Sequence, residues 1–429
     1  MMTLVTPVGT SLFTNYLNDN SNDGFRRAYE TLRISSASEW NEYDYDIDGL
    51  RTTSLAFIES RRESASAELQ SIAKIQAELQ NHINVRLLAS DTIVSRLAAE
   101  ILADETATSV LSDQGTVEFD AGTDVITGLQ VENPKTFSNE GMTNLIRKID
   151  STSANAGGRQ ATAINITGGF KATLPYLTIW AQLNSVPLYY TFEETDALIK
   201  IPQAPLTIDW DVVERHSDML HKIADGIENW SSFRDQHYQA VQDLEAFIEV
   251  DGQDALLSPI GEIFWEHYHT HFIVELPRGS YSPYDSKCRQ SIDKAIVELY
   301  QRLNTVLGPD FLDPEHCYDH IRNLGHNDDL NHSGQIPNPT GSQEREIFIF
   351  KSTNDEQVRL LYTFSVKERE IARLRIFDIL CRDFDHESYI EDWKGKFGRQ
   401  AFPEISFVTR TFEIPSRILS RRIQHVQTS

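Results

Sequence analysis

Short β-rich runs alternate with longer helical runs from the start of the chain to about residue 205, and this pattern limits the possible folds most strongly. The strand-like runs are TLVTPVGT, INVRLLAS, DVITGLQV, TAINIT, VPLYYTFE and ALIKIP. Between them lie helical runs, namely residues 64–79, TIVSRLAAEILA, FSNEGMTNLIRKIDS and FKATLPYLTIWAQLN. Strands that alternate with helices need crossover connections. The sequence therefore predicts an α/β domain with a mostly parallel, doubly wound sheet.

Small and polar residues follow three of the predicted strands. Because ligands bind beyond the carboxyl ends of the strands in such sheets, these residues are candidates for a binding site. Glycines allow close approach of the backbone to a ligand, and the start of a following helix, with a lysine beside it, favours a phosphate. The candidates are Gly9, Thr10 and Ser11 after the first strand, Ser90 and Asp91 after the second, and Thr167, Gly168, Gly169, Phe170 and Lys171 after TAINI.

Two alternatives bear on this site. The glycine pair can also serve only a strand-to-helix turn that requires positive φ, and the sequence leaves that reading open. The dinucleotide motif G-x-G-x-x-G and the P-loop motif are both absent, so a standard NAD or nucleotide triphosphate site is not supported.

Composition places the chain among soluble multidomain proteins. Its 429 residues contain no apolar run long enough for a membrane span and no secretory signal at the start. The three cysteines are odd in number and far apart, which favours a reducing cytoplasm. The net charge is −25, yet residues 341–429 hold 15 Lys and Arg against 14 Asp and Glu. The acidic excess therefore lies in the first 340 residues.

Several ordered motifs in residues 1–206 resemble the CARF domain, the Rossmann-like sensor of type III CRISPR systems. The motifs are PVGTSLFTN, the SDT after the second strand, NITGGFKATLPYL and VPLYYTFEETDALIKIPQAPL. This resemblance implies a homodimer that binds a cyclic oligoadenylate, with cyclic tetra-adenylate as the expected ring. Gly168, Gly169 and Lys171 would then hold ring phosphates, with Thr10 and Ser11 beside them.

Residues 207–271 form a mainly helical segment that contains one expected hairpin at Asp251-Gly252. Helices followed by a small hairpin resemble a winged helix-turn-helix. The acidic helices argue against DNA binding, so we expect a connector or dimerisation unit. His267, His269 and His271 would share one face of an extended run, a spacing compatible with a metal. Solvated or hydrogen-bonded histidines at an element end are the alternative, and we predict no metal and no cofactor.

Residues 272–429 resemble the RelE family of ribosome-dependent mRNA interferases. Arg345–Lys351 and Val358–Phe364 are expected to form a hairpin around the turn STNDEQ, and IARLRIFDILC a further strand. The helix DSKCRQSIDKAIVELYQRLN precedes them, as in that family. Residues 323–343 are predicted to be a loop.

The resemblance also implies the catalytic residues. Cleavage of RNA by its own 2′-hydroxyl requires a proton acceptor, a cation at the phosphorane oxygens and a proton donor for the leaving 5′-oxygen. The family supplies these mainly with lysine, arginine and tyrosine, and some relatives use a histidine as the acid. One departure is that Ile349 stands where the family has a second lysine. The matching positions here are Lys351, Arg359, Arg382, Tyr389 and His386.

Other readings of the C-terminal segment remain. Each arginine could form a surface salt bridge with Glu368, Glu370 or Asp383, and Asp383, Asp385 and His386 could indicate a metal-dependent nuclease. Alternatives for the whole chain are a ring-responsive winged-helix transcription regulator and a non-catalytic inhibitor that binds ribosomes.

Taken together, the two resemblances imply a CRISPR-associated mRNA interferase. Binding of the ring would activate cleavage of mRNA in the ribosomal A site. The expected partners are the ring, the ribosome with its mRNA, and a second copy of the chain. Because most of the chain is acidic and ribosomal RNA repels it, we also expect a ribosomal protein to serve as a docking site.

Overall fold

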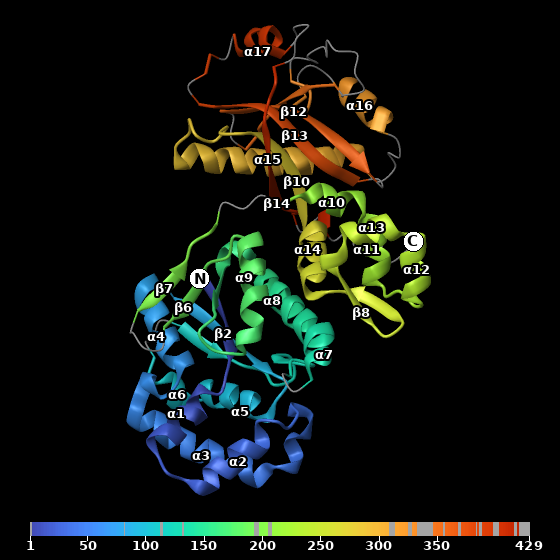
Figure 1. Ribbon diagram of the computed structural model, residues 1–429. Coiled ribbons are helices and arrows are strands. Elements are labelled where there is room, and N and C mark those ends of the chain that lie inside the picture. Colours follow the sequence, from blue (N-terminus) through green and yellow to red (C-terminus); the bar gives the residue numbers. More distant parts are fainter. Residues whose placement is uncertain are drawn as a thin grey trace. The chain divides into compact units, whose positions relative to one another are not determined.

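The computed structural model describes most of the chain in two compact units (Figure 1). The first unit contains Met1–Pro205 and His216–Trp265, and the second contains Leu206–Arg215 and Glu266–Ser429. The residues described are 2–80, 82–111, 115–130, 133–192, 197–204, 208–308, 314–324, 328–332, 346–354, 357–367, 370–382, 384–385, 388–397, 403–415 and 418–419.

The first unit is built on a seven-stranded sheet with the order β3-β2-β1-β5-β6-β7, in which β4 also pairs with β2. All pairs are parallel except β6 with β7, which confirms the predicted mostly parallel sheet. The strands are β1 (Met2–Val8), β2 (Ile83–Ser90), β3 (Gly115–Glu118), β4 (Val125–Ile126), β5 (Thr162–Asn165), β6 (Leu188–Thr191) and β7 (Leu198–Ile201).

Helices cover both faces of this sheet. Along β1, Leu4 packs into one hydrophobic cluster and Val5 into another, since neighbouring side chains of a strand point to opposite faces. The cluster with Leu4 includes helices α1 (Ser11–Asp19), α2 (Asp23–Leu32), α3 (Asp44–Arg61), α4 (Ala67–Leu79) and α5 (Ile93–Leu102). The cluster with Val5 includes α8 (Thr143–Asn155) and α9 (Leu174–Leu183). Short helices are α6 (Glu105–Thr108) and α7 (Pro134–Thr136).

Two predicted elements of the first unit differ from the structure. Only Val125–Ile126 of the run DVITGLQV is a strand, because the chain turns at Gly128 with φ 79°. The helix predicted over FSNEGMTNLIRKIDS begins with a π-helical turn at Phe137–Met142 before α8. Gly141 permits this turn to approach Gly128, since a Cβ at Gly141 would lie 2.5 Å from the Gly128 carbonyl oxygen.

Residues 208–270 contain helices α10 (Trp210–Arg215), α11 (Ser217–Ala224), α12 (Trp230–Gln236), α13 (Tyr238–Asp243) and α14 (Pro259–Thr270) and the hairpin β8 (Ile248–Asp251) and β9 (Asp254–Leu257). Gly252 takes φ 65° in the tight turn, as the Asp-Gly pair predicts. α10 belongs to the second unit, whereas residues 216–265 belong to the first. A separate connector with a winged-helix fold stays a prediction.

The histidine run is not extended, because His267 and His269 lie in α14 and His271 begins β10. His267 and His271 stack with ring centroids 3.7 Å apart, and the His267 Nε2 lies 2.9 Å from Thr411 Oγ1. Among the described residues, no group of three His, Cys, Asp or Glu side chains could hold a metal. No helix within the described residues has the length and apolar character needed to cross a membrane.

The second unit contains a five-stranded sheet with the order β11-β12-β13-β10-β14. β10 is parallel to β13, and the other pairs are antiparallel. The strands are β10 (His271–Pro277), β11 (Phe348–Lys351), β12 (Val358–Lys367), β13 (Glu370–Cys381) and β14 (Phe407–Glu413), and the helices are α15 (Ser286–Leu307), α16 (Pro314–Arg322) and α17 (Tyr389–Phe397). α15 packs on one face and α17 on the other, and the hairpin β11–β12 follows the prediction.

Candidate functional sites

The three strand ends chosen from the sequence meet at one edge of the first sheet. β1 lies between β2 and β5, and Pro7 pairs with Leu88 while Val5 pairs with Ile164. The parallel register therefore brings the residues after Val8, Ser90 and Asn165 together. A small pocket at this edge is lined in part by Pro7, Ser90, Gly169 and Phe170.

Glu68, at the start of α4, occupies the polar groups of the first turn. Its Oε1 accepts a hydrogen bond of 2.9 Å from the Gly9 N–H, and its Oε2 accepts one of 2.5 Å from the Ser11 hydroxyl. The side chain of Thr10 accepts a hydrogen bond of 3.2 Å from the Tyr29 hydroxyl. Glu68 is buried. Its carboxylate therefore already binds the Gly9 N–H and the Ser11 hydroxyl, two donors from which the sequence predicted a phosphate site.

The Gly168-Gly169 turn packs against the same carboxylate and the end of β1. A Cβ at Gly168 would collide with Glu68 Oε1 and lie 2.8 Å from the Pro7 carbonyl oxygen. Gly169 has φ 83°. Glycine is therefore required here both for space and for backbone conformation. Thr167 holds the turn to the next strand, because its hydroxyl accepts a hydrogen bond of 2.9 Å from the Thr191 N–H.

Ser90 and Asp91 organise the neighbouring loops. The Ser90 N–H donates to Ser95 Oγ at 2.9 Å, and the Ser95 hydroxyl donates to the Val8 carbonyl at 2.9 Å. The Asp91 carboxylate accepts from the Ala37 N–H at 3.2 Å and from the Gly128 N–H at 3.0 Å. Both residues shape the rim of the site through these bonds.

Lys171 is exposed and lies in the short helical turn that leads into α9. Phe170, next to it, packs on Phe137 of the π-helical turn with ring centroids 6.5 Å apart. The edge of the site thus carries the charged, flexible side chain of Lys171. The ring of Phe170 links the glycine turn to the segment before α8.

In the second unit, three of the predicted catalytic residues share one face of the sheet. Ile349 and Leu361 pack with Tyr389 and Trp393 of α17. Lys351 and Arg359 lie two residues from Ile349 and Leu361 respectively and are paired across β11 and β12, so they point to the same face. The guanidinium of the buried Arg359 lies 5.7 Å from the ring centroid of Phe384.

Tyr389 completes this group. Burial raises the pKa of its hydroxyl above 10.0, while the nearby Arg359 guanidinium lowers it. Phe384 and Trp393 pack against the Tyr389 ring edge to face, each with centroids 5.4 Å away. The phenol is therefore protonated at neutral pH and held beside a cation that would stabilise its phenolate.

Arg382 is placed differently from Arg359. It follows β13 with φ 55°, and its N–H donates to the Gln357 carbonyl at 3.0 Å. Its charge contributes to the lowered pKa of Asp285, at the start of α15, after the larger effect of a hydrogen bond from the Cys288 backbone. His386 lies outside the described residues, as does Asp383.

Two residues of these sites are missed by sequence reasoning, Glu68 and His332. Glu68 is 59 residues from Gly9 in the chain, and no motif marks it. His332 lies within the segment predicted only as a loop, and the charges of Arg359 and Lys351 act on its imidazole. A polar loop has no periodicity from which contact with β11 could have been foreseen.

Comparison with known proteins gives one family match. Residues 63–204, which belong to the first unit, match the model of a family described as CRISPR-associated protein (Cas_APE2256). The structure of Can2 from Sulfobacillus thermosulfidooxidans in complex with cyclic tetra-adenylate is similar at 11% identity and a TM-score of 0.21, over 79% of this chain and 88% of that chain. A TM-score of this size is too low to indicate whether the two chains share a fold. The family match supports the predicted CRISPR-associated character of the first unit.

Proposed function

We propose that this chain, whose residues 63–204 match a CRISPR-associated family, is an endoribonuclease activated by a cyclic oligoadenylate. The first unit would be the CARF sensor, and the second would cut mRNA on the ribosome as RelE-like interferases do. The observation that carries the proposal is the placement of Lys351, Arg359 and Tyr389 on one face of the second sheet.

The sensor part of the proposal is supported by the edge at which β2, β1 and β5 end. Gly168, Gly169 and Lys171 would approach the phosphates of the ring, most favourably of cyclic tetra-adenylate. Because the Gly9 N–H and the Ser11 hydroxyl already bind Glu68, these two groups would shape the floor of the site.

The cleavage part follows from the charges on the α17 face. Lys351 and Arg359 would stabilise the phosphorane oxygens, a form of preorganised electrostatic stabilisation that is among the largest catalytic effects. The Tyr389 hydroxyl would donate a proton to the leaving 5′-oxygen. A homodimer and docking on a ribosomal protein remain part of the proposal.

The decisive experiment maps RNA 5′ ends in a translation reaction with and without each cyclic oligoadenylate. We expect new ends within codons at the ribosomal A site, only when a ring is added. Ribosome binding without new ends would favour the non-catalytic inhibitor, and protection of a DNA operator would favour a transcription regulator.

Substitution of the two arginines tests the chemistry. Arg359→Ala is expected to lower cleavage by about a hundredfold or more, because loss of a preorganised cation commonly costs ~3 kcal/mol. We expect a similar loss for Arg382→Ala. The control is Arg322→Ala on α16, whose side chain pairs with Asp319. Wild-type rates in both arginine variants would refute the RelE-like assignment.

A further inference from the structure

Residues 328–332 run along the outer side of β11, the edge strand of the second sheet. The His332 N–H donates to the Ile349 carbonyl at 2.9 Å, and the Lys351 N–H donates to the Asp329 carbonyl at 2.9 Å. The segment therefore covers backbone groups that an edge strand would leave open. It also places His332 beside the strand that carries Lys351.

Further contacts fix this segment. Leu330 is fully buried, and its carbonyl accepts a hydrogen bond of 2.9 Å from the Tyr362 hydroxyl. The Asn331 side-chain amide donates to the Arg322 carbonyl at 3.3 Å. These contacts hold the backbone next to His332 in place, and a catalytic side chain needs such a fixed position.

The surroundings of His332 favour its neutral form. Burial lowers the pKa of the imidazole below 6.5, and the charges of Arg359 on β12 and Lys351 on β11 lower it further. Asp329, in the same segment, acts in the opposite direction. A neutral imidazole at pH 7 can accept a proton.

We propose that His332 is the general base that takes the proton of the attacking 2′-hydroxyl. This inference rests on the proposed function. Ile349 stands where the RelE family has a second lysine and cannot accept a proton, so His332 would supply the missing proton acceptor. The proton passes from the 2′-oxygen to the imidazole as the 2′-oxygen bonds to phosphorus. The bond from phosphorus to the 5′-oxygen breaks, and that oxygen takes a proton from the Tyr389 hydroxyl, which leaves a 2′,3′-cyclic phosphate and a 5′-hydroxyl.

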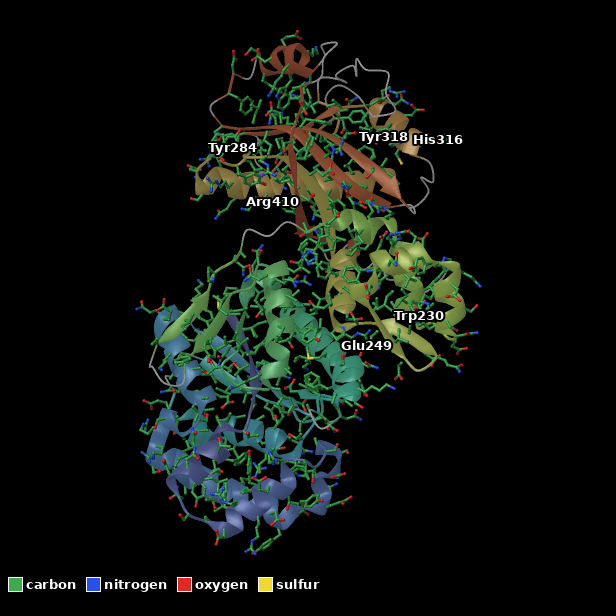
Figure 2. All side chains as sticks on the ribbon, viewed as in Figure 1. Trp230, Glu249, Tyr284, His316, Tyr318 and Arg410 are labelled. Carbon is green, nitrogen blue, oxygen red and sulfur yellow. The ribbon has the colours of Figure 1, made fainter. Side chains whose placement is uncertain are left out.

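The first test measures cleavage of a short mRNA on ribosomes by the full chain with cyclic tetra-adenylate present. We expect His332→Gln to lower kcat by about 10²- to 10⁴-fold with little change in KM, as loss of a general base does. The matched control is His316→Gln on α16 (Figure 2), which should cut at the wild-type rate.

The pH profile gives a second readout. The wild-type rate should fall as the pH drops below the imidazole pKa, and this acid limb should lie below pH 6.5 because the pKa of His332 is lowered. The residual activity of His332→Gln should lack that limb. A direct NMR titration of the His332 ring in the wild-type chain should give a pKa below 6.5, and this measurement does not depend on how well a variant folds.

A sulfur-substituted RNA distinguishes a base from an acid. A 5′-bridging sulfur at the scissile phosphate is a good leaving group without protonation. It should therefore restore cleavage to Tyr389→Phe but not to His332→Gln.

The outcomes separate cleanly. Three results would overturn the role of His332 and leave the proposed function standing. They are cleavage of the sulfur-substituted RNA by His332→Gln at the wild-type rate, a wild-type rate with an unchanged acid limb in that variant on ordinary RNA, and a His332 ring pKa at or above 6.5. Failure of the wild-type chain to cut mRNA on ribosomes would overturn the proposed function and this role together.

Discussion

Glu68 places a buried carboxylate against the turn that we propose for the ring phosphates. Glu68→Gln keeps the shape of the side chain and removes its charge. We expect it to raise the affinity for cyclic tetra-adenylate by at least a few-fold, since a like charge near a surface site costs on the order of 1 kcal/mol or more. Calorimetric titration measures this. Equal affinity would mean that no phosphate lies over Gly168.

Loss of the carboxylate altogether should affect the fold of the first unit. Glu68→Ala leaves the Gly9 N–H and the Ser11 hydroxyl without their acceptor. We expect the free energy of unfolding to fall by about 1–3 kcal/mol, the cost of leaving partly buried donors unpaired. Denaturant unfolding would show it, and a change smaller than the experimental error would contradict the role of Glu68 as an internal anion.

Lys171 tests the same turn from its exposed side. Lys171→Ala should weaken ring binding by about 1.5–3 kcal/mol, because it removes a charge-assisted phosphate contact. Lys222→Ala on α11 is a matched exposed control in the same unit. If Lys171→Ala binds the ring as the wild type does, the turn is not a phosphate site.

Single residues also show where sequence reasoning succeeds. The hairpin that carries Lys351 and Arg359 could be predicted, because two alternating runs flank a short polar turn. Glu68 could not, because only the folded packing of α4 brings it to a turn far away in the chain. The close approach at Gly168 was foreseeable, but the group that occupies the space was not.

Among the elements, α15 controls the turn of the hairpin that carries Lys351 and Arg359. Glu298 of α15 is buried, and its carboxylate accepts hydrogen bonds from the Ser352 hydroxyl at 2.6 Å and the Thr353 N–H at 2.9 Å. The turn between β11 and β12 is thus bound to the helix on the opposite face of the sheet.

Glu298→Ala should therefore affect both stability and cleavage. The unpaired donors of the turn should lower the free energy of unfolding by about 1–3 kcal/mol. Small displacements of a catalytic group cost considerable rate, so cleavage should fall about tenfold or more at a temperature where the variant is folded. Thermal unfolding and cleavage rates measure the two effects. An unchanged rate would show that the turn does not position Lys351 and Arg359.

Elements were predicted unevenly for physical reasons. The hairpin β11–β12 and the strand β13 have long alternating patterns, and the structure confirms them. The segment 328–332 lacks such a pattern, because its order comes from pairing with β11 and from the burial of Leu330. The π-helical turn before α8 depends on two glycines that meet in space, which local propensity does not report.

For the whole molecule, the formal net charge of −25 limits how the protein could bind the ribosome that we propose as its partner. Ribosomal RNA should repel most of the chain, and attraction beyond a Debye length is screened in any case. We predict a second attachment to a ribosomal protein, which would raise the effective concentration of the second unit near the codon.

Binding of the full chain to purified ribosomal proteins, freed of RNA, tests this attachment. We expect measurable binding to at least one of them. Binding to intact ribosomes should then weaken only modestly with salt, unlike binding through many phosphate contacts. No affinity for any ribosomal protein, together with a steep salt dependence, would show that RNA alone holds the molecule.

The placement of α10 has a consequence for how the protein is made. Asp211 and Glu214 of α10 form ion pairs of 2.5 and 2.6 Å with Arg373 of β13, and Asp211 lies 162 residues earlier in the chain. At synthesis rates of 5–20 residues per second, Arg373 is made roughly 10 to 30 s after α10. All of the first unit has left the ribosome by then. If the two units are the sensor and the nuclease that we propose, each new chain would possess its sensor before it possesses a finished nuclease, and the order of synthesis itself would protect the cell that makes it.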